Sequence, residues 1–227
     1  GDINSKSMQI IESSDFVGDA VNFIVSSLTG NCNGPSRISL CGGSTPEPVY
    51  EALAEAKLDR SNIEITFGDE RCVPPDHEDS NFRMASYSLL DKVPLNKDNI
   101  LRIRGELDPA DAASEYEGSL RERSGGEIYT HDLILLGMGE DGHTASLFPG
   151  TSALNDNEHW VASNHVPQKG ETRITFTYPI INAAQKILFL VRGEEKRKVV
   201  DCVLSGKSDL PASFVNPEKG SVTWLLD

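Results

Sequence analysis

The chain lacks the features that mark membrane proteins and nucleic-acid-binding proteins. None of its apolar runs approaches the roughly 20 residues that a membrane-spanning helix needs. Basic residues are few, because 21 Lys and Arg stand against 35 Asp and Glu, which gives a formal net charge of −14. Since phosphate backbones attract basic surfaces, we expect no nucleic-acid partner and no membrane partner. A small anion can still bind, because a local set of Arg, Lys and backbone N–H groups suffices.

Cysteine is also scarce and widely spaced. No CxxC pair occurs among the four cysteines, Cys32, Cys41, Cys72 and Cys202. This spacing gives neither a zinc cluster nor a disulfide framework, and scattered thiols are typical of the cytosol. We therefore expect a cytoplasmic protein without a metal. Residues 1–7 are polar and have no apolar core of a signal peptide, so we expect a disordered start or a cloning remnant ahead of Met8.

Short apolar runs alternate with helical patterns along the whole chain. The hydrophobic content of 38% and the charged content of 25% are typical of a globular protein. The patterns predict strands at 37–40, 63–67, 100–103, 132–136, 160–163, 173–177, 186–191 and 222–225. They predict helices at 16–28, 48–56, 81–90, 109–123, 179–184 and 194–204. This order predicts an α/β fold in which residues 8–227 form one domain. Its sheet should be mostly parallel, Rossmann-like and doubly wound, with helices on both faces.

The most informative stretch, residues 133–150, reads LILLGMGEDGHTASLFPG. Four apolar residues predict a strand covered on both faces, and the glycines that follow allow backbone angles closed to other residues. Asp141 and His143 then stand at the carboxyl end of this strand, where open α/β sheets bind ligands. A histidine there can take a proton from water. A plain strand-to-helix turn does not need this combination, so we favour a catalytic site.

Two further segments follow predicted strands. The run Gly42-Gly43-Ser44-Thr45-Pro46 opens a helix, where glycine amides, hydroxyls and the helix dipole favour phosphate. It is neither a Walker A loop nor GxGxxG, and an ordinary tight turn is the alternative. In the predicted loop 68–71, Asp69 and Arg71 can orient sugar hydroxyls and a phosphate, although alone they would be read as a surface ion pair.

A fourth segment, residues 165–173, offers two more cations. Arg173 opens a predicted strand and is the better candidate for a substrate contact. For Lys169, a solvated loop lysine is an equally good interpretation. The other histidines lack supporting context and are predicted to be surface or structural residues: His77, His131, His159 and His165.

Together these motifs resemble the 6-phosphogluconolactonase family. The resemblance is carried by residues 42–46, 68–71, 137–149, 173–175, 210–213 and 224–227. It implies a sugar-phosphate isomerase-like fold shared with glucosamine-6-phosphate deaminase. It also implies hydrolysis of 6-phospho-D-glucono-1,5-lactone to 6-phospho-D-gluconate in the oxidative pentose phosphate pathway. No cofactor is implied; the partner is a phosphorylated sugar lactone, and we expect a monomer or a weak homodimer.

The resemblance also implies roles for individual residues. His143 matches the general base that activates water, and Asp141 matches the neighbouring acid. Gly43, Ser44 and Thr45 match the phosphate loop, and Arg71 and Arg173 match substrate-contacting arginines. From their place in the same two segments, Gly42 and Asp69 are further candidates for substrate or phosphate binding. Gly142 and Thr144 are further candidates for substrate or phosphate binding. On chemical grounds, backbone N–H groups of the glycine turn could stabilise the oxyanion. Many relatives carry a lysine five residues before the equivalent of Arg173; here Gln168 stands there and Lys169 follows.

Three alternatives remain at this point. Ser44 and Ser146 lie in no GxSxG elbow, which makes a serine-hydrolase triad the weaker mechanism. An amino-sugar-phosphate deaminase or isomerase would use a glutamate where this chain has Phe148, which cannot transfer protons. A non-catalytic sugar-phosphate-binding module would bind the ligand without turnover.

Overall fold

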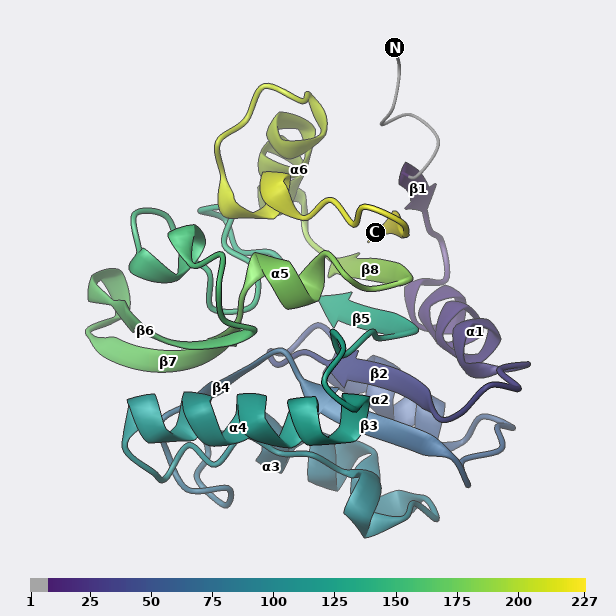
Figure 1. Ribbon diagram of the computed structural model, residues 1–227. Helices are drawn as coiled ribbons and strands as arrows, with labels where there is room; N and C mark the ends of the chain where they lie inside the picture. Colours follow the sequence, from purple (N-terminus) through teal and green to yellow (C-terminus); the bar gives the residue numbers. More distant parts are fainter. Residues whose placement is uncertain (1–7) are drawn as a thin grey trace.

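A six-stranded parallel sheet forms the centre of this computed structural model, which describes residues 8–227 (Figure 1). The expectation for residues 1–7 lies outside the described residues. In spatial order the strands are β1 (Met8–Glu12), β9 (Ser221–Leu226), β8 (Lys186–Val191), β5 (Leu133–Leu136), β2 (Ser36–Leu40) and β3 (Ile63–Phe67). Every neighbouring pair is parallel. The predicted α/β class with a mostly parallel sheet is confirmed.

Helices cover both faces of this sheet. The helices are α1 (Phe16–Leu28), α2 (Glu47–Ala54), α3 (Asn81–Ser88), α4 (Pro109–Ser124), α5 (Tyr178–Ile181) and α6 (Arg197–Leu204). α2 contacts α1 and α3, whereas α4 and α5 lie in front of the sheet in Figure 1. The side chains of Asp15, Ser80 and Asp108 cap the first turns of α1, α3 and α4, because they accept hydrogen bonds from backbone N–H groups there.

A second, antiparallel sheet stands beside the first and was not predicted. It consists of β4 (Asp69–Arg71), β7 (Glu171–Phe176) and β6 (Val161–Val166) in the order β4-β7-β6. The predicted loop at 68–71 is therefore wrong, because residues 69–71 form a strand. Gly68 joins the two sheets: its N–H donates to Leu40 of β2 at 3.2 Å, and its carbonyl accepts from Phe176 of β7 at 2.8 Å.

Other boundaries differ from the prediction for tertiary reasons. Residues 100–103 form no strand, because only Ile100 makes a bridge, to Ile65 of β3. β1 was missed, since its residues are mostly exposed and only pairing with β9 makes it a strand. The helix expected at 194–204 begins as a 3₁₀ turn, η5 (Glu194–Lys196). The other 3₁₀ turns are η1 (Leu90–Lys92), η2 (Lys97–Asn99), η3 (Ser152–Asn155), η4 (Pro167–Lys169) and η6 (Pro211–Phe214).

The strand order places a crevice at the carboxyl ends of β2 and β5. These two strands are neighbours, but the chain continues from β2 outward to β3 and from β5 in the opposite direction to β8. Connections that leave in opposite directions open a crevice, in which open α/β sheets bind ligands. In Figure 1 the arrowheads of β2, β5 and β8 point to the same side of the molecule, where β6 and β7 lie.

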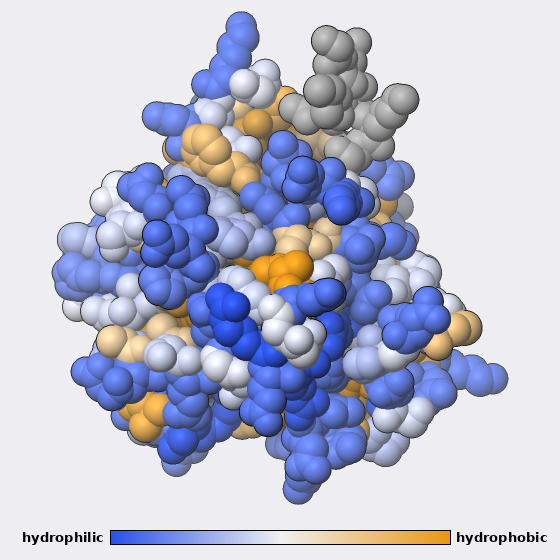
Figure 2. Space-filling view, in the orientation of Figure 1, coloured by the Kyte–Doolittle hydropathy of each residue, from blue (hydrophilic) through white to orange (hydrophobic). Residues whose placement is uncertain are grey.

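The surface is mostly polar on the face drawn in Figure 2, where apolar residues form small, separate patches. The core lies instead between the sheet and its helices. All four residues of β5 are at most 1% exposed, as expected for a strand covered on both faces. This buried strand holds the loop that follows it in a fixed position.

Candidate active site

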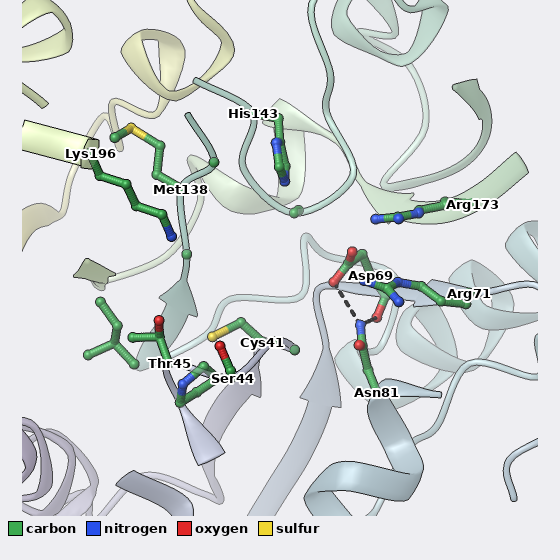
Figure 3. Close-up of a pocket in the computed structure, with 17 residues that line it drawn as sticks. Cys41, Ser44, Thr45, Asp69, Arg71, Asn81, Met138, His143, Arg173 and Lys196 are labelled. Atoms are coloured by element: carbon green, nitrogen blue, oxygen red, sulfur yellow. Dashed lines mark hydrogen bonds between the residues drawn. The ribbon is translucent and has the colours of Figure 1, made fainter. Parts of the chain in front are cut away.

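A pocket of about 240 Å³ occupies this crevice (Figure 3). Its walls come from the carboxyl ends of β2, β5 and β8, from β4 and β7 of the second sheet, and from the start of α3. The residues that line it are Cys41, Gly42, Gly43, Ser44, Thr45, Pro46, Asp69, Arg71, Asn81, Gly137, Met138, Gly139, His143, Ala145, Arg173, Leu190 and Lys196. Three segments predicted from the sequence to approach one sheet edge therefore share one cavity.

The loop from Gly42 to Thr45 is fixed at the end of β2. The hydroxyl of Tyr50, in α2, accepts a hydrogen bond from the Cys41 N–H at 2.8 Å and donates to the Cys41 carbonyl at 2.6 Å. Gly43 has a φ of +98°, which other residues rarely adopt, and α2 begins directly beyond the loop. Gly42 lies against Asn81, since a Cβ at Gly42 would be 2.0 Å from Asn81 Oδ1. The loop thus presents a helix start to the pocket.

The loop after β5 holds His143 against Asp141. Asp141 Oδ1 accepts from the His143 backbone N–H at 3.0 Å and lies 2.6 Å from His143 Nδ1. Partial burial would raise the pKa of Asp141, but these hydrogen bonds outweigh it and leave the pKa below its usual value. Because Nδ1 is engaged, Nε2 is the ring nitrogen left for the pocket. This geometry suits a general base.

Gly142 and Thr144, predicted to bind substrate or phosphate, do not line the pocket. Thr144 is 1% exposed, and its hydroxyl donates to the Gly137 carbonyl at 2.8 Å. The Gly142 carbonyl accepts from the Ala212 N–H at 3.0 Å. Both residues stabilise the loop through these hydrogen bonds, whereas Gly137, Met138 and Gly139 line the pocket.

Two arginines enter the pocket from the second sheet. Arg173 is 7% exposed, and its Nε and Nη2 both lie 2.8 Å from Glu171 Oε1. Arg71 donates from Nη1 to the Asp79 carbonyl at 3.3 Å, while its buried Nε has no hydrogen-bond partner among residues 8–227. A buried donor without a partner is costly, so a bound anion would satisfy it.

Asp69 is held inside a buried network. Its Oδ2 accepts from the Ser146 hydroxyl at 2.7 Å, and its Oδ1 accepts from Asn81 Nδ2 at 3.1 Å. The neighbouring Glu70 is also buried, and burial raises its pKa although it accepts hydrogen bonds from Ser80 and from the start of α3. These two carboxylates fix β4 against α3 and thereby orient the arginine that follows them.

The structure does not bring Lys169 to the pocket. It is exposed in η4, the turn between β6 and β7, and is not among the lining residues. Lys196, which sequence reasoning missed, lines the pocket instead. Figure 3 shows Lys196 on the side of Thr45 and Met138, while Arg71 and Arg173 lie on the opposite side. A sequence signal existed, because Gly193-Glu194-Glu195-Lys196 follows a buried strand just as the other site loops do.

The lining offers no activated nucleophile. Burial raises the pKa of the Cys41 thiol to about 12, so the thiol stays protonated near neutral pH. Ser146 donates a hydrogen bond from its hydroxyl to Asp69 and does not line the pocket.

Across residues 8–227 no group of three or more His, Cys, Asp and Glu side chains is arranged to hold a metal ion. Within the same range, no helix is long and apolar enough to cross a membrane.

A family model described as glucosamine-6-phosphate isomerases/6-phosphogluconolactonase matches residues 12–224. The chain belongs to this family. Among curated members, the 6-phosphogluconolactonase of Nostoc sp. is 43% identical over 197 residues, covering 84% of this chain and 81% of that protein. The 6-phosphogluconolactonase of Synechocystis sp. is 41% identical over 201 residues, covering 86% of this chain and 82% of that protein.

Solved structures of family members share the fold. The crystal structure of 6-phosphogluconolactonase from Thermotoga maritima has a TM-score of 0.86 and 29% identity, covering 97% of this chain and 99% of that chain. The 6-phosphogluconolactonase from Trypanosoma cruzi has the same TM-score and 30% identity, covering 97% of this chain and 94% of that one. The fold prediction and the family resemblance are thereby confirmed.

Proposed function

We propose that this family member hydrolyses 6-phospho-D-glucono-1,5-lactone to 6-phospho-D-gluconate. One observation carries the proposal: His143, held by Asp141, faces a pocket that also contains a phosphate-type loop and Lys196. A general base and an anion site in one cavity suit a substrate that has both an ester carbonyl and a phosphate. The curated relatives named 6-phosphogluconolactonase support the same activity.

The phosphate end of the pocket is the loop Gly42–Thr45 with Lys196. The loop carries backbone N–H groups and two hydroxyls, and Lys196 carries an ammonium; all of them can donate to phosphate oxygens. The carbonyl end is formed by His143, Arg71 and Arg173. The substrate would therefore lie along the pocket, with its phosphate near Thr45 and its lactone carbonyl near His143.

His143 acts as the general base in this mechanism. Its Nε2 takes a proton from water while the water oxygen forms a bond to the lactone carbonyl carbon, and Asp141 stabilises the imidazolium that results. The negative charge that develops on the carbonyl oxygen is stabilised by the arginines. When the bond from the carbonyl carbon to the ring oxygen breaks, the imidazolium returns the proton to that oxygen. No covalent enzyme intermediate is needed.

The isomerase activity also named in the family description is less well supported. Moving protons during ring opening calls for a free carboxyl group near the sugar. Among the lining residues the single carboxylate is Asp69, and both its oxygens already accept hydrogen bonds from Ser146 and Asn81.

We further propose that residues 8–227 act as one domain and that the protein is a monomer or a weak homodimer. Its place would be the pentose phosphate pathway in the cytoplasm.

The test is hydrolysis of freshly prepared 6-phosphogluconolactone, corrected for spontaneous decay. Wild type should be active, and His143→Ala should lose about 10²–10⁴-fold in kcat, the usual contribution of a general base. His159→Ala is a matched control, because His159 pairs with Asp156 at 3.0 Å but lies outside the pocket. A wild type no faster than the blank would contradict the function, and equal activity of His143→Ala would contradict the base.

A further inference from the structure

Phe148 lies directly behind the imidazole of His143. Its side chain is 0% exposed and does not line the pocket, whereas His143 does. The two rings are stacked, with centroids 4.0 Å apart and planes inclined by 15°. This separation is close to van der Waals contact between the ring faces, so Phe148 forms a flat support for the imidazole.

Besides Phe148, the imidazole is contacted by Asp141 and Gly139. The Asp141 carboxylate fixes the direction of Nδ1, but a single hydrogen bond allows the ring plane to tilt about its axis. Gly139 borders the ring, since a Cβ there would be 2.2 Å from His143 Cε1. Among residues 8–227 the aromatic side chain stacked on this ring is Phe148. The stack therefore removes the tilt that Asp141 permits.

The support itself is anchored to the second sheet. The Phe148 carbonyl accepts from the Thr151 N–H at 3.2 Å and from the Thr151 hydroxyl at 2.7 Å. Asn164, in β6, is 0% exposed and donates to Thr151 Oγ1 at 3.0 Å and to the Ser146 carbonyl at 2.9 Å. These bonds hold the turn from Ser146 to Thr151 rigidly, and with it the position of the Phe148 ring.

Phe148 also approaches Arg173, whose guanidinium carbon lies 5.3 Å from the ring centroid. Arg173 has an anchor of its own, because Glu171 accepts from two of its nitrogens. The ring of His143, by contrast, is held by the Phe148 stack and by one hydrogen bond to Asp141. Loss of the aromatic ring should consequently disturb the base more than the arginine.

We propose that Phe148 is a positioning residue that sets the plane of the His143 ring, so that Nε2 points at the attacking water. This inference rests on the proposed lactone hydrolysis and specifies how the base is aligned. Alignment matters because a misplacement of about 1 Å can cost roughly 10²-fold in rate. Phe148 acts through His143 and need not touch the substrate.

The test compares Phe148→Met with Phe148→Tyr in the lactonase assay. Met keeps an apolar side chain of similar volume without a flat face, so kcat should fall about 10–100-fold while KM changes little. Tyr keeps the flat face and should restore most of kcat. Thermal unfolding shows whether each variant is folded. In the NMR spectrum, the His143 Cε1 proton should lose its ring-current shift in Phe148→Met.

A double-mutant cycle separates positioning from a general structural role. Phe148→Met should change kcat little when His143 is already Ala, because the residue acts through that ring. An unchanged kcat in Phe148→Met, or an equal loss with and without His143, would overturn the proposal. An inactive wild type would instead contradict the lactonase function, so the two failures are distinguishable.

Discussion

Arg71 and Arg173 are direct partners in the antiparallel ladder between β4 and β7. Like charges placed opposite each other on neighbouring strands destabilise a sheet. Glu171 offsets the charge of Arg173, but the buried Arg71 Nε has no partner among residues 8–227. We therefore propose that the pair serves an anionic ligand or a developing negative charge, and that binding rather than folding explains it.

Removing Arg71 should therefore impair catalysis more than stability. Arg71→Gln is expected to lower kcat/KM for the phosphorylated lactone about 10–100-fold, the effect of losing one charged hydrogen bond of about 1.5–3 kcal/mol. The melting temperature should stay within a few degrees of wild type or rise. Steady-state kinetics and thermal unfolding measure both effects. Arg104→Gln is the control, because this exposed arginine pairs with Glu115. A large drop in melting temperature with intact kinetics would refute the argument.

Lys196 and Lys169 provide a second matched comparison. Lys196→Met should raise KM for the phosphorylated lactone about tenfold or more, since one ammonium contact to phosphate is lost. Lys169→Met should leave KM unchanged, because Lys169 is exposed in η4 and does not line the pocket. Inhibition by inorganic phosphate should weaken in Lys196→Met alone. If Lys169→Met has the larger effect, the cation at the phosphate end has been assigned to the wrong residue.

His131 should make the protein sensitive to acid. It is completely buried beside Tyr129 and Phe176, and its Nε2 lies 2.8 Å from Thr66 Oγ1. Burial lowers its pKa from 6.5 to about 3, with a smaller contribution from Arg37. The unfolded chain consequently binds this proton first as the pH falls below 6.5. Stability that is fully present above pH 6.5 should be lost toward pH 3, by up to about 1.4 kcal/mol per pH unit.

Urea unfolding at a series of pH values measures this slope. His131→Gln should be less stable at pH 7, since it disturbs a buried contact. Between pH 6.5 and the lowered pKa, its free energy of unfolding should fall less steeply with decreasing pH than that of wild type, because the proton uptake by His131 is absent. His165→Gln removes an exposed histidine and should leave the pH dependence unchanged. A pH dependence that is the same in His131→Gln and in wild type would show that other groups control the acid transition.

Local sequence patterns predicted most of the central sheet and much of the site. The buried run of β5 and the glycines after it are signals contained within a few residues of one another. For that reason the positions of the loop Gly42–Thr45 and of His143 at one sheet edge followed from strand order alone. Asp141 and His143 are two residues apart, so their contact was also accessible from sequence.

Features that depend on distant partners were missed or misplaced. β4 is three residues long and exists as a strand because β7 pairs with it, while β1 is exposed and exists because β9 does. For Lys169 the sequence left a substrate contact and a solvated loop lysine equally open, and the turn between β6 and β7 keeps it at the surface. Lys196 follows the buried strand β8 as the other site loops follow theirs, but a lone lysine in a turn does not by itself indicate a binding site.

The sequence by itself determined the alternation of strands and helices, the turn glycines and the Asp141–His143 pair, because each depends on local backbone preferences and on the periodicity of apolar residues. Tertiary structure alone decided which cations reach the pocket, how Arg71 comes to face Arg173, and what stacks on the His143 ring. These relationships join segments that are distant along the chain or lie on separate turns. They are set by sheet pairing and side-chain packing, which no local pattern encodes.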